Sequence, residues 1–228
     1  MKEHRFLKAA AGEEPADLLL THARIVDVFT GRILNGHIAI LEDRIIGIGE
    51  YSAKRVEDLK GKFAAPGFIE PHAHIESSMT SVTEFVRAVL PRGTTTVVAD
   101  PHEIANVSGA SGIEYMLCSA EKQPMSIYYA LPSCVPATCM ETAGARLEAS
   151  DLSKFIHNVR VAAMGEMMNF PGVLGADAGV LAKIALARSI GKRVDGHGPG
   201  LSGKSLSAYV LAGISSDHEC TTPEEALE

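Results

Sequence analysis

The pattern of hydrophobic and polar positions changes near residue 62, and each side of that point predicts a different architecture. Between residues 16 and 50, short apolar runs rich in β-branched residues are separated by tight polar turns. Short strands joined by tight turns predict a small antiparallel sheet or sandwich. We therefore expect residues 1–62 to form a small N-terminal β-sandwich domain, with residues 1–15 charged and irregular. The clearest predicted strands are 23–28, 36–41 and 44–49.

Beyond residue 62, strand patterns alternate with helical ones. Apolar residues at 82, 85, 86, 89 and 90 form a helical stripe, with Ser81 and Glu84 as a capping box and Gly93 as a stop. Repeated βα units imply a parallel sheet with right-handed crossovers. We predict an α/β fold in which residues 63–228 form a (β/α)8 TIM barrel that is incomplete, because only about six βα units are visible. The predicted strands are 63–69, 94–99, 126–131, 159–164, 193–195 and 213–216, and the other predicted helices are 110–120, 151–158, 178–190 and 205–211.

Composition narrows the classes of partner and compartment. The chain has 228 residues, 46% of them hydrophobic, which is enough for a sizeable core. A net charge of -7 argues against a nucleic-acid backbone or an anionic membrane as the main partner. The sequence has no apolar run of transmembrane length and no signal-peptide core, and its four cysteines form no C-x-x-C pair. We expect a cytoplasmic protein with reduced thiols, acting on a small molecule.

Polar residues that follow the predicted strands carry the candidate chemistry. His72 and His74 are one residue apart, so on a strand both side chains point to the same face. Glu166, His197 and His218 follow three later strands, and a closing barrel brings all five to one mouth. Four imidazoles and one carboxylate suit two divalent cations with the carboxylate as the bridge, a pair that ionises water beside a carbon electrophile. The alternative for each histidine is an ordinary polar residue at a strand end or in a loop, whereas a buried Glu166 needs a partner.

Several motifs make the chain similar to the amidohydrolase superfamily, and specifically to its adenine deaminases. H-x-H alone marks only the superfamily, while E-S-S-M (76–79), D-P-H-E (100–103) and G-E-M-M (165–168) are far more specific. The resemblance extends from about residue 16 to residue 228 and includes residues 66–75, 90–98, 133–137 and 195–201. It implies a TIM barrel of the amidohydrolase type and the hydrolytic deamination of adenine to hypoxanthine and ammonia, a step of purine salvage or catabolism. It also implies two metal ions, Mn²⁺ or Fe²⁺, with Zn²⁺ possible, and we expect a homodimer.

The same resemblance implies roles for individual residues. His72 and His74 hold one metal, His197 and His218 hold the second, and Glu166 bridges both. Four further residues flank the mouth, and each has a structural role beside the metal ligands as its alternative. We expect Glu76 and His102 to act with Glu166 in catalysis, and Asp100 and Glu103 to bind the substrate. The family also expects a metal-linked aspartate after strand eight, which lies outside this sequence, so we expect these 228 residues alone to deaminate adenine more slowly than a completed chain.

Three other interpretations remain beside this one. Residues 198–205 match the phosphate-loop pattern G-x-x-x-x-G-K-[ST]. An NTPase is not favoured, because Pro199 removes a cradling N–H and no strand ending in a Walker-type aspartate follows. A cytidine-deaminase zinc site is excluded by the absence of C-x-x-C. The remaining alternatives are another amidohydrolase acting on a cyclic amide or amidine, and a truncated, inactive, metal-binding remnant.

Overall fold

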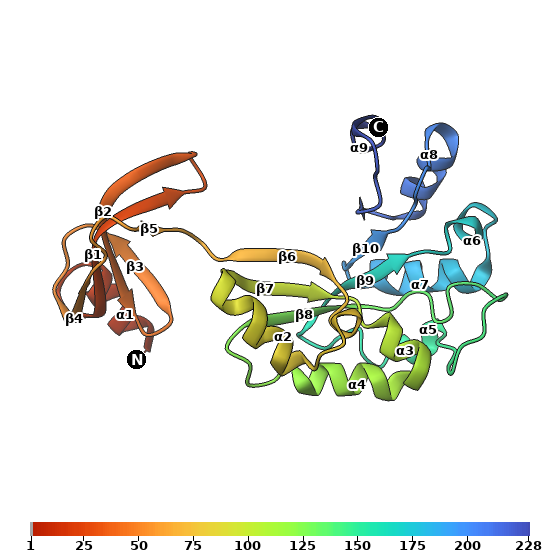
Figure 1. The fold of residues 1–228 in the computed structure, drawn as a ribbon, viewed down its shortest axis with the longest axis horizontal. Coiled ribbons are helices and arrows are strands. Elements are labelled where there is room, and N and C mark those ends of the chain that lie inside the picture. The colour runs from red at the N-terminus through yellow and green to blue at the C-terminus, as the bar shows by residue number, and fades with distance from the viewer. Residues whose placement is uncertain (1) are drawn as a thin grey trace. The chain divides into compact units, whose positions relative to one another are not determined.

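A computed structural model describes residues 2–228, which divide into two compact units, one ending at Pro66 and one spanning Gly67–Glu228. The sequence had placed the boundary after residue 62. The first unit is one five-stranded sheet of order β3-β2-β1-β4, with β5 paired to β1 (Figure 1). Its elements are α1 (Lys2–Ala10), β1 (Ala16–Asp27), β2 (Arg32–Leu41), β3 (Arg44–Ile48), β4 (Ala53–Asp58) and β5 (Phe63–Ala64).

The sequence predicted an antiparallel sheet or sandwich, but the structure contains a single mixed sheet. The length of β1 explains this difference. β1 pairs with β2 along both of its halves, and the register shifts between Leu20 and Ala23, where His22 adopts a φ of +51°. A bulge of this kind bends a strand. The first half of β1 pairs in parallel with β4 and the second half with β5, so all the strands connect through β1. Phe63 and Ala64 therefore belong to this sheet and not to the first barrel strand.

Helix α1 corrects the prediction that residues 1–15 are irregular. Arg5 on α1 pairs with Asp17 and with Glu42, at 3.1 Å in each case, and Ala9 is fully buried. The hydroxyl of Tyr51 donates to the carbonyl of Ala10 at 3.1 Å. A nine-residue helix is too short to be stable alone, and contacts with distant strands stabilise it.

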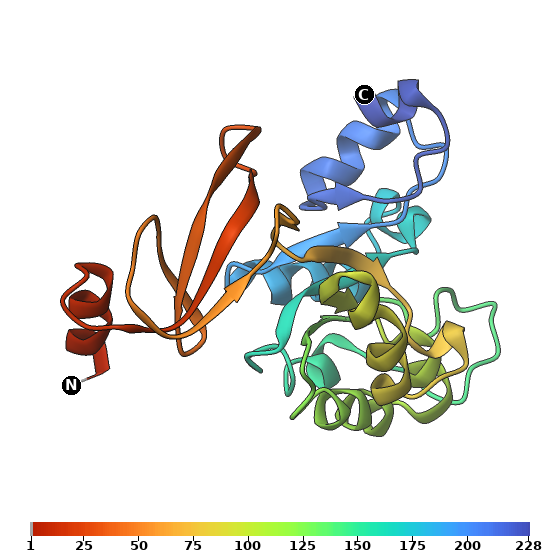
Figure 2. The same cartoon turned by 60° about the vertical axis from the view of Figure 1, so that its left-hand side comes forward.

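The second unit is a six-stranded sheet of order β11-β10-β9-β8-β7-β6, in which every neighbouring pair is parallel. Figure 1 and Figure 2 show β6 to β10 following one another across the sheet. This order confirms the predicted α/β barrel topology with six strands present. The strands are β6 (Phe68–Ala73), β7 (Thr94–Ala99), β8 (Ser126–Leu131), β9 (Val161–Met167), β10 (Arg193–Gly196) and β11 (Ser216–Asp217).

Helices connect successive strands, as the alternating pattern predicted. Ser81 caps α2 (Val82–Val89) by accepting a hydrogen bond from the Glu84 amide, and Gly93, at φ +102°, ends the turn that follows. The predicted helix 151–158 is shorter and shifted, since only α5 (Ala149–Leu152) is helical. The remaining helices are η1 (Glu76–Ser78), η2 (Leu90–Arg92), α3 (His102–Ser108), α4 (Ala110–Ser119), α6 (Phe170–Leu174), α7 (Ala178–Ser189), α8 (Gly203–Ala212) and α9 (Pro223–Leu227).

The core of this unit lies between the sheet and the helices, and the sheet itself is curled. Val97, Ile127 and Met164, one from each central strand, are fully buried in it. The rings of His72 and His218, which come from opposite edges of the sheet, stack with centroids 3.7 Å apart. That contact requires the carboxyl ends of the outer strands to approach one another, as in a barrel. Among residues 2–228, no helix combines the length and apolar content that crossing a bilayer requires.

Candidate metal centre

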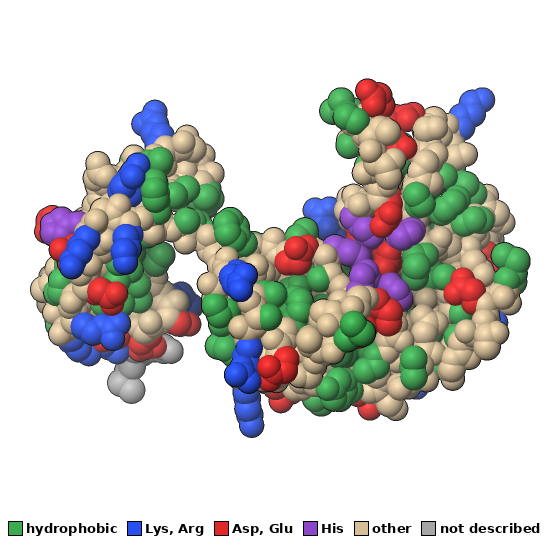
Figure 3. Space-filling view, viewed as in Figure 1, with side chains coloured by type: hydrophobic (Ala, Val, Ile, Leu, Met, Phe, Trp, Pro, Cys, Tyr) green, Lys and Arg blue, Asp and Glu red, His purple; other side chains and the backbone are tan. Residues whose placement is uncertain are grey.

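Histidine and acidic side chains gather in one group on the second unit (Figure 3). His72 lies in β6 with His74 just after it, Glu166 lies in β9, and His197 and His218 directly follow β10 and β11. Because the strands are parallel, their carboxyl ends lie along one edge of the sheet. The structure therefore brings together all five residues that the sequence singled out as metal ligands.

Glu166 is at the centre of the group, with a side chain only 3% exposed. Its Oε1 lies 3.3 Å from His74 Nε2 and 3.9 Å from His72 Nε2. Its Oε2 lies 2.5 Å from His197 Nδ1 and 3.3 Å from His218 Nε2. Three sets of potential ligands share this carboxylate: His72, His74 and Glu166; Glu166, His197 and His218; and Asp100, His102 and Glu166. The first two correspond to the two predicted ion positions.

The hydrogen bonds of His72 and His74 are enough to show that the first ligand set suits a cation. His72 Nδ1 faces an Asp195 carboxylate oxygen at 3.0 Å, and His74 Nδ1 faces the Asp100 carbonyl oxygen at 2.9 Å. Both acceptors require a proton on Nδ1, so in the neutral rings both Nε2 atoms carry lone pairs. Those two Nε2 atoms are only 3.0 Å apart. Such an approach needs a positive centre between or beside them, either a proton or a metal ion.

The pKa shifts of Glu166 and His72 also favour a cation at this site. Burial alone would raise the pKa of Glu166, but contact with His102 and the charges of the surrounding imidazoles outweigh burial and lower the pKa to about 2. Burial lowers the pKa of His72, but its hydrogen bond to Asp195 and the charge of Glu166 outweigh burial, so the net shift is upward. The site therefore favours an ionised Glu166 carboxylate and positive charge beside it at His72.

Asp100 and His102 lie directly beside Glu166. Asp100 is 1% exposed, and its Oδ2 accepts a hydrogen bond from the Glu166 amide at 3.0 Å. His102 Nδ1 is 3.2 Å from Glu166 Oε1, off the direction of a hydrogen bond. Burial raises the pKa of Asp100 to about 8, while burial lowers the pKa of His102 less than the adjacent carboxylates raise it, to about 9. Asp100 thus contacts the backbone of Glu166, and His102 contacts its carboxylate.

Glu76 and Glu103 form a neighbouring acidic corner. Glu76 Oε1 accepts from the Ile104 amide at 3.2 Å, and Glu103 accepts from the hydroxyl of Ser77. Glu103 Oε2 lies 3.6 Å from His74 Nδ1 and 3.8 Å from His102 Nε2. The buried side-chain atoms that lack a hydrogen bond within residues 2–228 all fall in this corner: Glu76 Oε2, Asp100 Oδ1, His102 Nδ1 and Glu103 Oε2. Unpaired buried polar atoms of this kind mark a place for a ligand, an ion or water.

Comparison with known proteins agrees with this geometry. The amidohydrolase family matches residues 63–228, which hold every residue of the metal centre. The chain belongs to the amidohydrolase family. Curated relatives named adenine deaminase include those of Desulfatibacillum aliphaticivorans, 52% identical over 100% of this chain, and Kosmotoga olearia, 54% identical over 97%. The chain spans 40% and 39% of the length of these two relatives.

Solved structures of lower identity share the amidohydrolase fold. N-acyl-D-glutamate deacylase from Bordetella bronchiseptica superposes with a TM-score of 0.64 at 17% identity, covering 92% of this chain and 53% of that one. N-isopropylammelide isopropylaminohydrolase from Burkholderia multivorans superposes with a TM-score of 0.62 at 16% identity, covering 92% and 64%. The family match confirms the predicted family, and the solved structures confirm its barrel fold.

Several residues that support this amidohydrolase site were missed by the sequence analysis. Asp195 contacts both His72 and His218, and the hydroxyl of Tyr209 accepts from the His197 amide at 3.0 Å. The hydroxyl of Ser133 donates to the Glu166 carbonyl at 2.5 Å, and Lys183 Nζ donates to the Ser133 carbonyl at 2.7 Å. Only Asp195 had a usable signal, because it is an acid at a predicted strand end. The others come from loops and helices whose approach depends on the fold.

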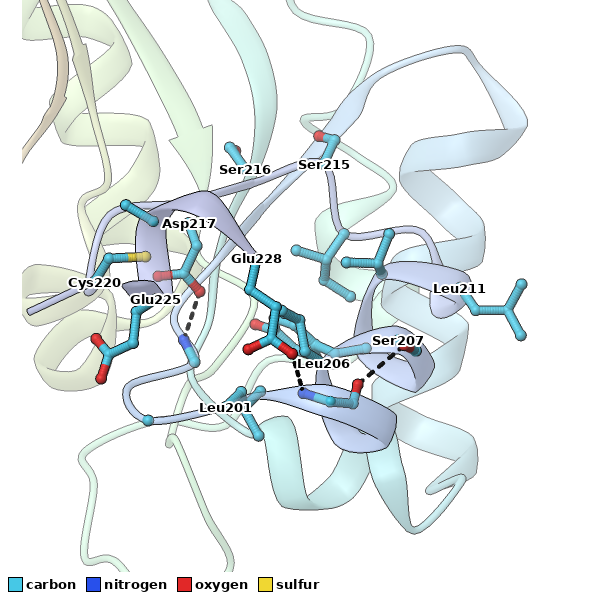
Figure 4. Close-up of a pocket in the computed structure, with 17 residues that line it drawn as sticks. Leu201, Leu206, Ser207, Leu211, Ser215, Ser216, Asp217, Cys220, Glu225 and Glu228 are labelled. Atoms are coloured by element: carbon cyan, nitrogen blue, oxygen red, sulfur yellow. Dashed lines mark hydrogen bonds between the residues drawn. The ribbon is translucent and has the colours of Figure 1, made fainter. Parts of the chain in front are cut away.

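A cavity of about 840 Å³ lies between α8, α9 and β11 (Figure 4). The phosphate-loop match lines it, and the Gly203 amide at the start of α8 donates to Glu228 Oε1 at 2.7 Å. Asp217 accepts from the Gly198 amide at 2.8 Å. Carboxylates therefore contact the amides that a nucleotide phosphate would need, and the motif is a strand-to-helix connection.

Proposed function

We propose that this chain supplies the two-metal half of a site that hydrolyses adenine to hypoxanthine and ammonia. The observation that carries the proposal is Glu166, whose two oxygens each face a different pair of histidines. Four imidazoles and one bridging carboxylate suit two divalent ions such as Mn²⁺, Fe²⁺ or Zn²⁺. The substrate follows from relatives named adenine deaminase that are 52% and 54% identical to this chain.

The bound ions would supply an acidified water and Lewis-acid polarisation at the reacting carbon. One adenine and one water give one hypoxanthine and one ammonia, so a C6–O bond forms as the C6–N6 bond breaks. The two protons of the water must reach N1 and the departing nitrogen, which requires groups that hold and release protons.

The positions of the side chains indicate which residues move these protons. Glu166 faces both ion positions and is held ionised, so its carboxylate orients the donor set. His102, 3.2 Å from Glu166 Oε1, is placed to carry a proton at Nδ1. Glu76 and Glu103 offer unpaired buried oxygens that suit the N–H groups of a purine ring. The contact of Asp100 with the Glu166 amide favours a role in orienting Glu166 over direct substrate contact.

Metal content tests the ligand assignment. His72→Ala and His218→Ala each delete one ligand, so elemental analysis of Mn²⁺-loaded protein should show the loss of bound metal. His157→Ala, an exposed histidine of the same unit, is the matched control and should keep the metal. Unchanged metal content in both ligand variants would contradict the two-metal site.

A chimera tests the reaction. Residues 1–228 replace the matching segment of the Desulfatibacillum aliphaticivorans relative, of which they cover 40%. The chimera should convert adenine to hypoxanthine with release of ammonia, both measured after chromatography. The same chimera carrying His102→Ala should lose about 100-fold or more in rate, the typical worth of one acid–base group. A chimera that binds Mn²⁺ but leaves adenine intact would refute adenine as the substrate while keeping the metal site.

A further inference from the structure

Asp195, at the end of β10, is shared by one histidine from each ligand set. Its Oδ2 lies 3.0 Å from His72 Nδ1 and 3.3 Å from His218 Nδ1. The two histidines come from opposite edges of the six-stranded sheet, and their rings stack at 3.7 Å with 23° between their planes. All three side chains are largely buried, at 16%, 18% and 23% exposure for His72, Asp195 and His218.

This contact sets the chemical form of both imidazoles. An ionised carboxylate oxygen only accepts hydrogen bonds, so the hydrogen bond between His72 and Asp195 puts the proton of the neutral His72 ring on Nδ1. The approach of His218 Nδ1 to the same oxygen favours the same tautomer of His218. The lone pair of each ring is then on Nε2, which in both residues points to Glu166. His72 Nε2 is 3.9 Å from Oε1, and His218 Nε2 is 3.3 Å from Oε2. The stacked imidazoles of His72 and His218 thus connect the Asp195 carboxylate to the two oxygens of Glu166.

The second oxygen of Asp195 is held separately. Oδ1 accepts from the Ser216 hydroxyl at 2.7 Å and from the Gly196 amide at 3.1 Å. These two donors fix the plane of the carboxylate and leave Oδ2 for the histidines. An asparagine of the same shape cannot satisfy this arrangement. Its NH₂ group would face either the two Nδ1–H groups or the Gly196 N–H, and each pairing sets donor against donor.

We infer that Asp195 is a positioning residue that couples the two ion positions, so that filling one prepares the other. The inference rests on the proposed two-metal function. His72, His74 and Glu166 would hold one ion, and binding it would fix the His72 ring against Asp195 and fix the Glu166 carboxylate. The stacked His218 ring and Glu166 Oε2 are then already oriented for the second ion. Outer carboxylates that orient metal-binding histidines typically contribute 10- to 100-fold in metal affinity.

The experiment is a Mn²⁺ titration of the metal-free chain, followed by calorimetry and by electron paramagnetic resonance. Two Mn²⁺ ions bridged by one carboxylate give a spin-coupled spectrum, whereas an isolated ion gives the ordinary uncoupled one. With one equivalent of Mn²⁺, coupled filling should produce mainly the paired spectrum. Asp195→Asn should weaken binding about 10- to 100-fold and give mainly the isolated-ion spectrum at the same loading.

Asp217→Asn is the matched control. It removes the same charge from the neighbouring strand end, and the Asp217 carboxylate accepts from the Gly198 and Glu219 amides, at 2.8 Å each. It should keep the paired spectrum and affinity of the parent chain. Ser216→Ala keeps the shared oxygen, its charge and the Gly196 amide that still holds the carboxylate, so it should keep the paired spectrum as well. This variant tests the coupling even if Asp195→Asn does not fold. If Ser216→Ala gives the isolated-ion spectrum while the parent chain gives only the paired one, the assignment of Oδ2 as the coupling oxygen is overturned.

The outcomes separate this inference from the proposed function. If Asp195→Asn binds Mn²⁺ with the affinity of the parent chain and gives the paired spectrum, the coupling is overturned but the metal site is not. Equal weakening in Asp195→Asn and Asp217→Asn would also overturn it, because lost charge alone would then explain the effect. A parent chain that binds no Mn²⁺ would refute the proposed function, and the coupling with it.

Discussion

At the scale of single residues, the site depends on how tightly the backbone of Glu166 is held. The Asp100 carboxylate accepts from its amide, and the Ser133 hydroxyl donates to its carbonyl. Lys183, 8% exposed, donates to the Ser133 carbonyl from α7. Gly165 leaves the space that Asp100 needs, since a Cβ there would lie 2.1 Å from Asp100 Oδ2. The bridging carboxylate is therefore positioned by three neighbouring groups and by one missing side chain.

Gly165→Ala should displace Asp100 and release the Glu166 amide. The clash involves the Asp100 carboxylate and, at 2.8 Å, the Leu131 carbonyl, so the backbone must move. We expect a loss of stability of about 1–3 kcal/mol, typical of overpacking, and clearly weaker Mn²⁺ binding. Urea unfolding and calorimetry measure the two effects. Gly179→Ala, whose Cβ would meet nothing closer than 3.3 Å at the start of α7, should change neither by much.

Lys183→Ala should destabilise the second unit through the carbonyl it leaves behind. The buried Ser133 carbonyl would lose its donor, which costs about 1–3 kcal/mol, and the stem of the lysine would leave a gap. Equilibrium unfolding in urea measures the loss. Lys192→Ala, which removes another lysine that donates to a backbone carbonyl but is less buried, should cost less. An unchanged midpoint in Lys183→Ala would show that water replaces the ammonium.

At the scale of elements, Asp17 joins four parts of the first unit. Its carboxylate pairs with Arg5 of α1 at 3.1 Å and with Lys54 of β4 at 2.7 Å, and it accepts from the Glu42 amide in the β2–β3 turn at 3.0 Å. The hydrogen bond from Lys54 and that from the Glu42 amide lower the pKa of Asp17 from 3.8 to about 2. The docking of α1 and β4 therefore depends on an ionised Asp17.

This shift predicts an acid-sensitive first unit. A carboxyl group with a depressed folded pKa stabilises the fold above its unfolded pKa, and that stability is lost as the pH falls through the folded pKa. The contribution of Asp17 should therefore be present above about pH 4 and disappear toward about pH 2. Hydrogen exchange of α1 and β1 amides, compared at these two pH values, measures it. Asp17→Asn should remove the pH dependence, and Asp43→Asn, an exposed acid in the same turn region, should keep it.

At the scale of the whole second unit, the metal centre connects the two edges of the parallel sheet. His72 belongs to β6 and His218 follows β11, the outermost strands, and Glu166 and Asp195 lie between them on β9 and β10. Contacts in the group join strand ends that the chain order separates, such as those of His72 and Asp195, 123 positions apart. A bound ion would replace repulsion among these carboxylates with shared ligation.

Metal removal should therefore loosen the curled sheet. A ligand that binds only the folded state stabilises it by about 2.7 kcal/mol at 100 times its Kd. Adding Mn²⁺ should raise the unfolding temperature of the second unit, and a chelator should lower it, as followed by differential scanning calorimetry. Mg²⁺ at the same concentration should have much less effect, because it prefers oxygen ligands to imidazoles. Equal shifts with both ions would indicate general charge screening instead of the site.

The sequence by itself determined the parallel barrel topology and which histidines gather around Glu166 in the candidate metal centre. Both follow from local periodicity: apolar strands alternate with amphipathic helices, and in a parallel sheet the residue after each strand lies at a common edge. His72, His74, Glu166, His197 and His218 are therefore identifiable from their positions alone. The capped start of α2 was visible for the same reason, because Ser81 and Glu84 act within one turn.

Only the tertiary structure decided the features that depend on distant contacts. Helix α1 is stabilised by β1 and by the β2–β3 turn, and β5 leaves the barrel because the bulged second half of β1 pairs with it. The contacts of Asp195 with His72, of Ser133 with Glu166 and of Lys183 with Ser133 join positions at least 33 apart. The periodicity of a sequence shows which face of its helix or strand a side chain lies on, but not which other side chain it contacts there. The contact partner is decided by packing and by the curl of the sheet.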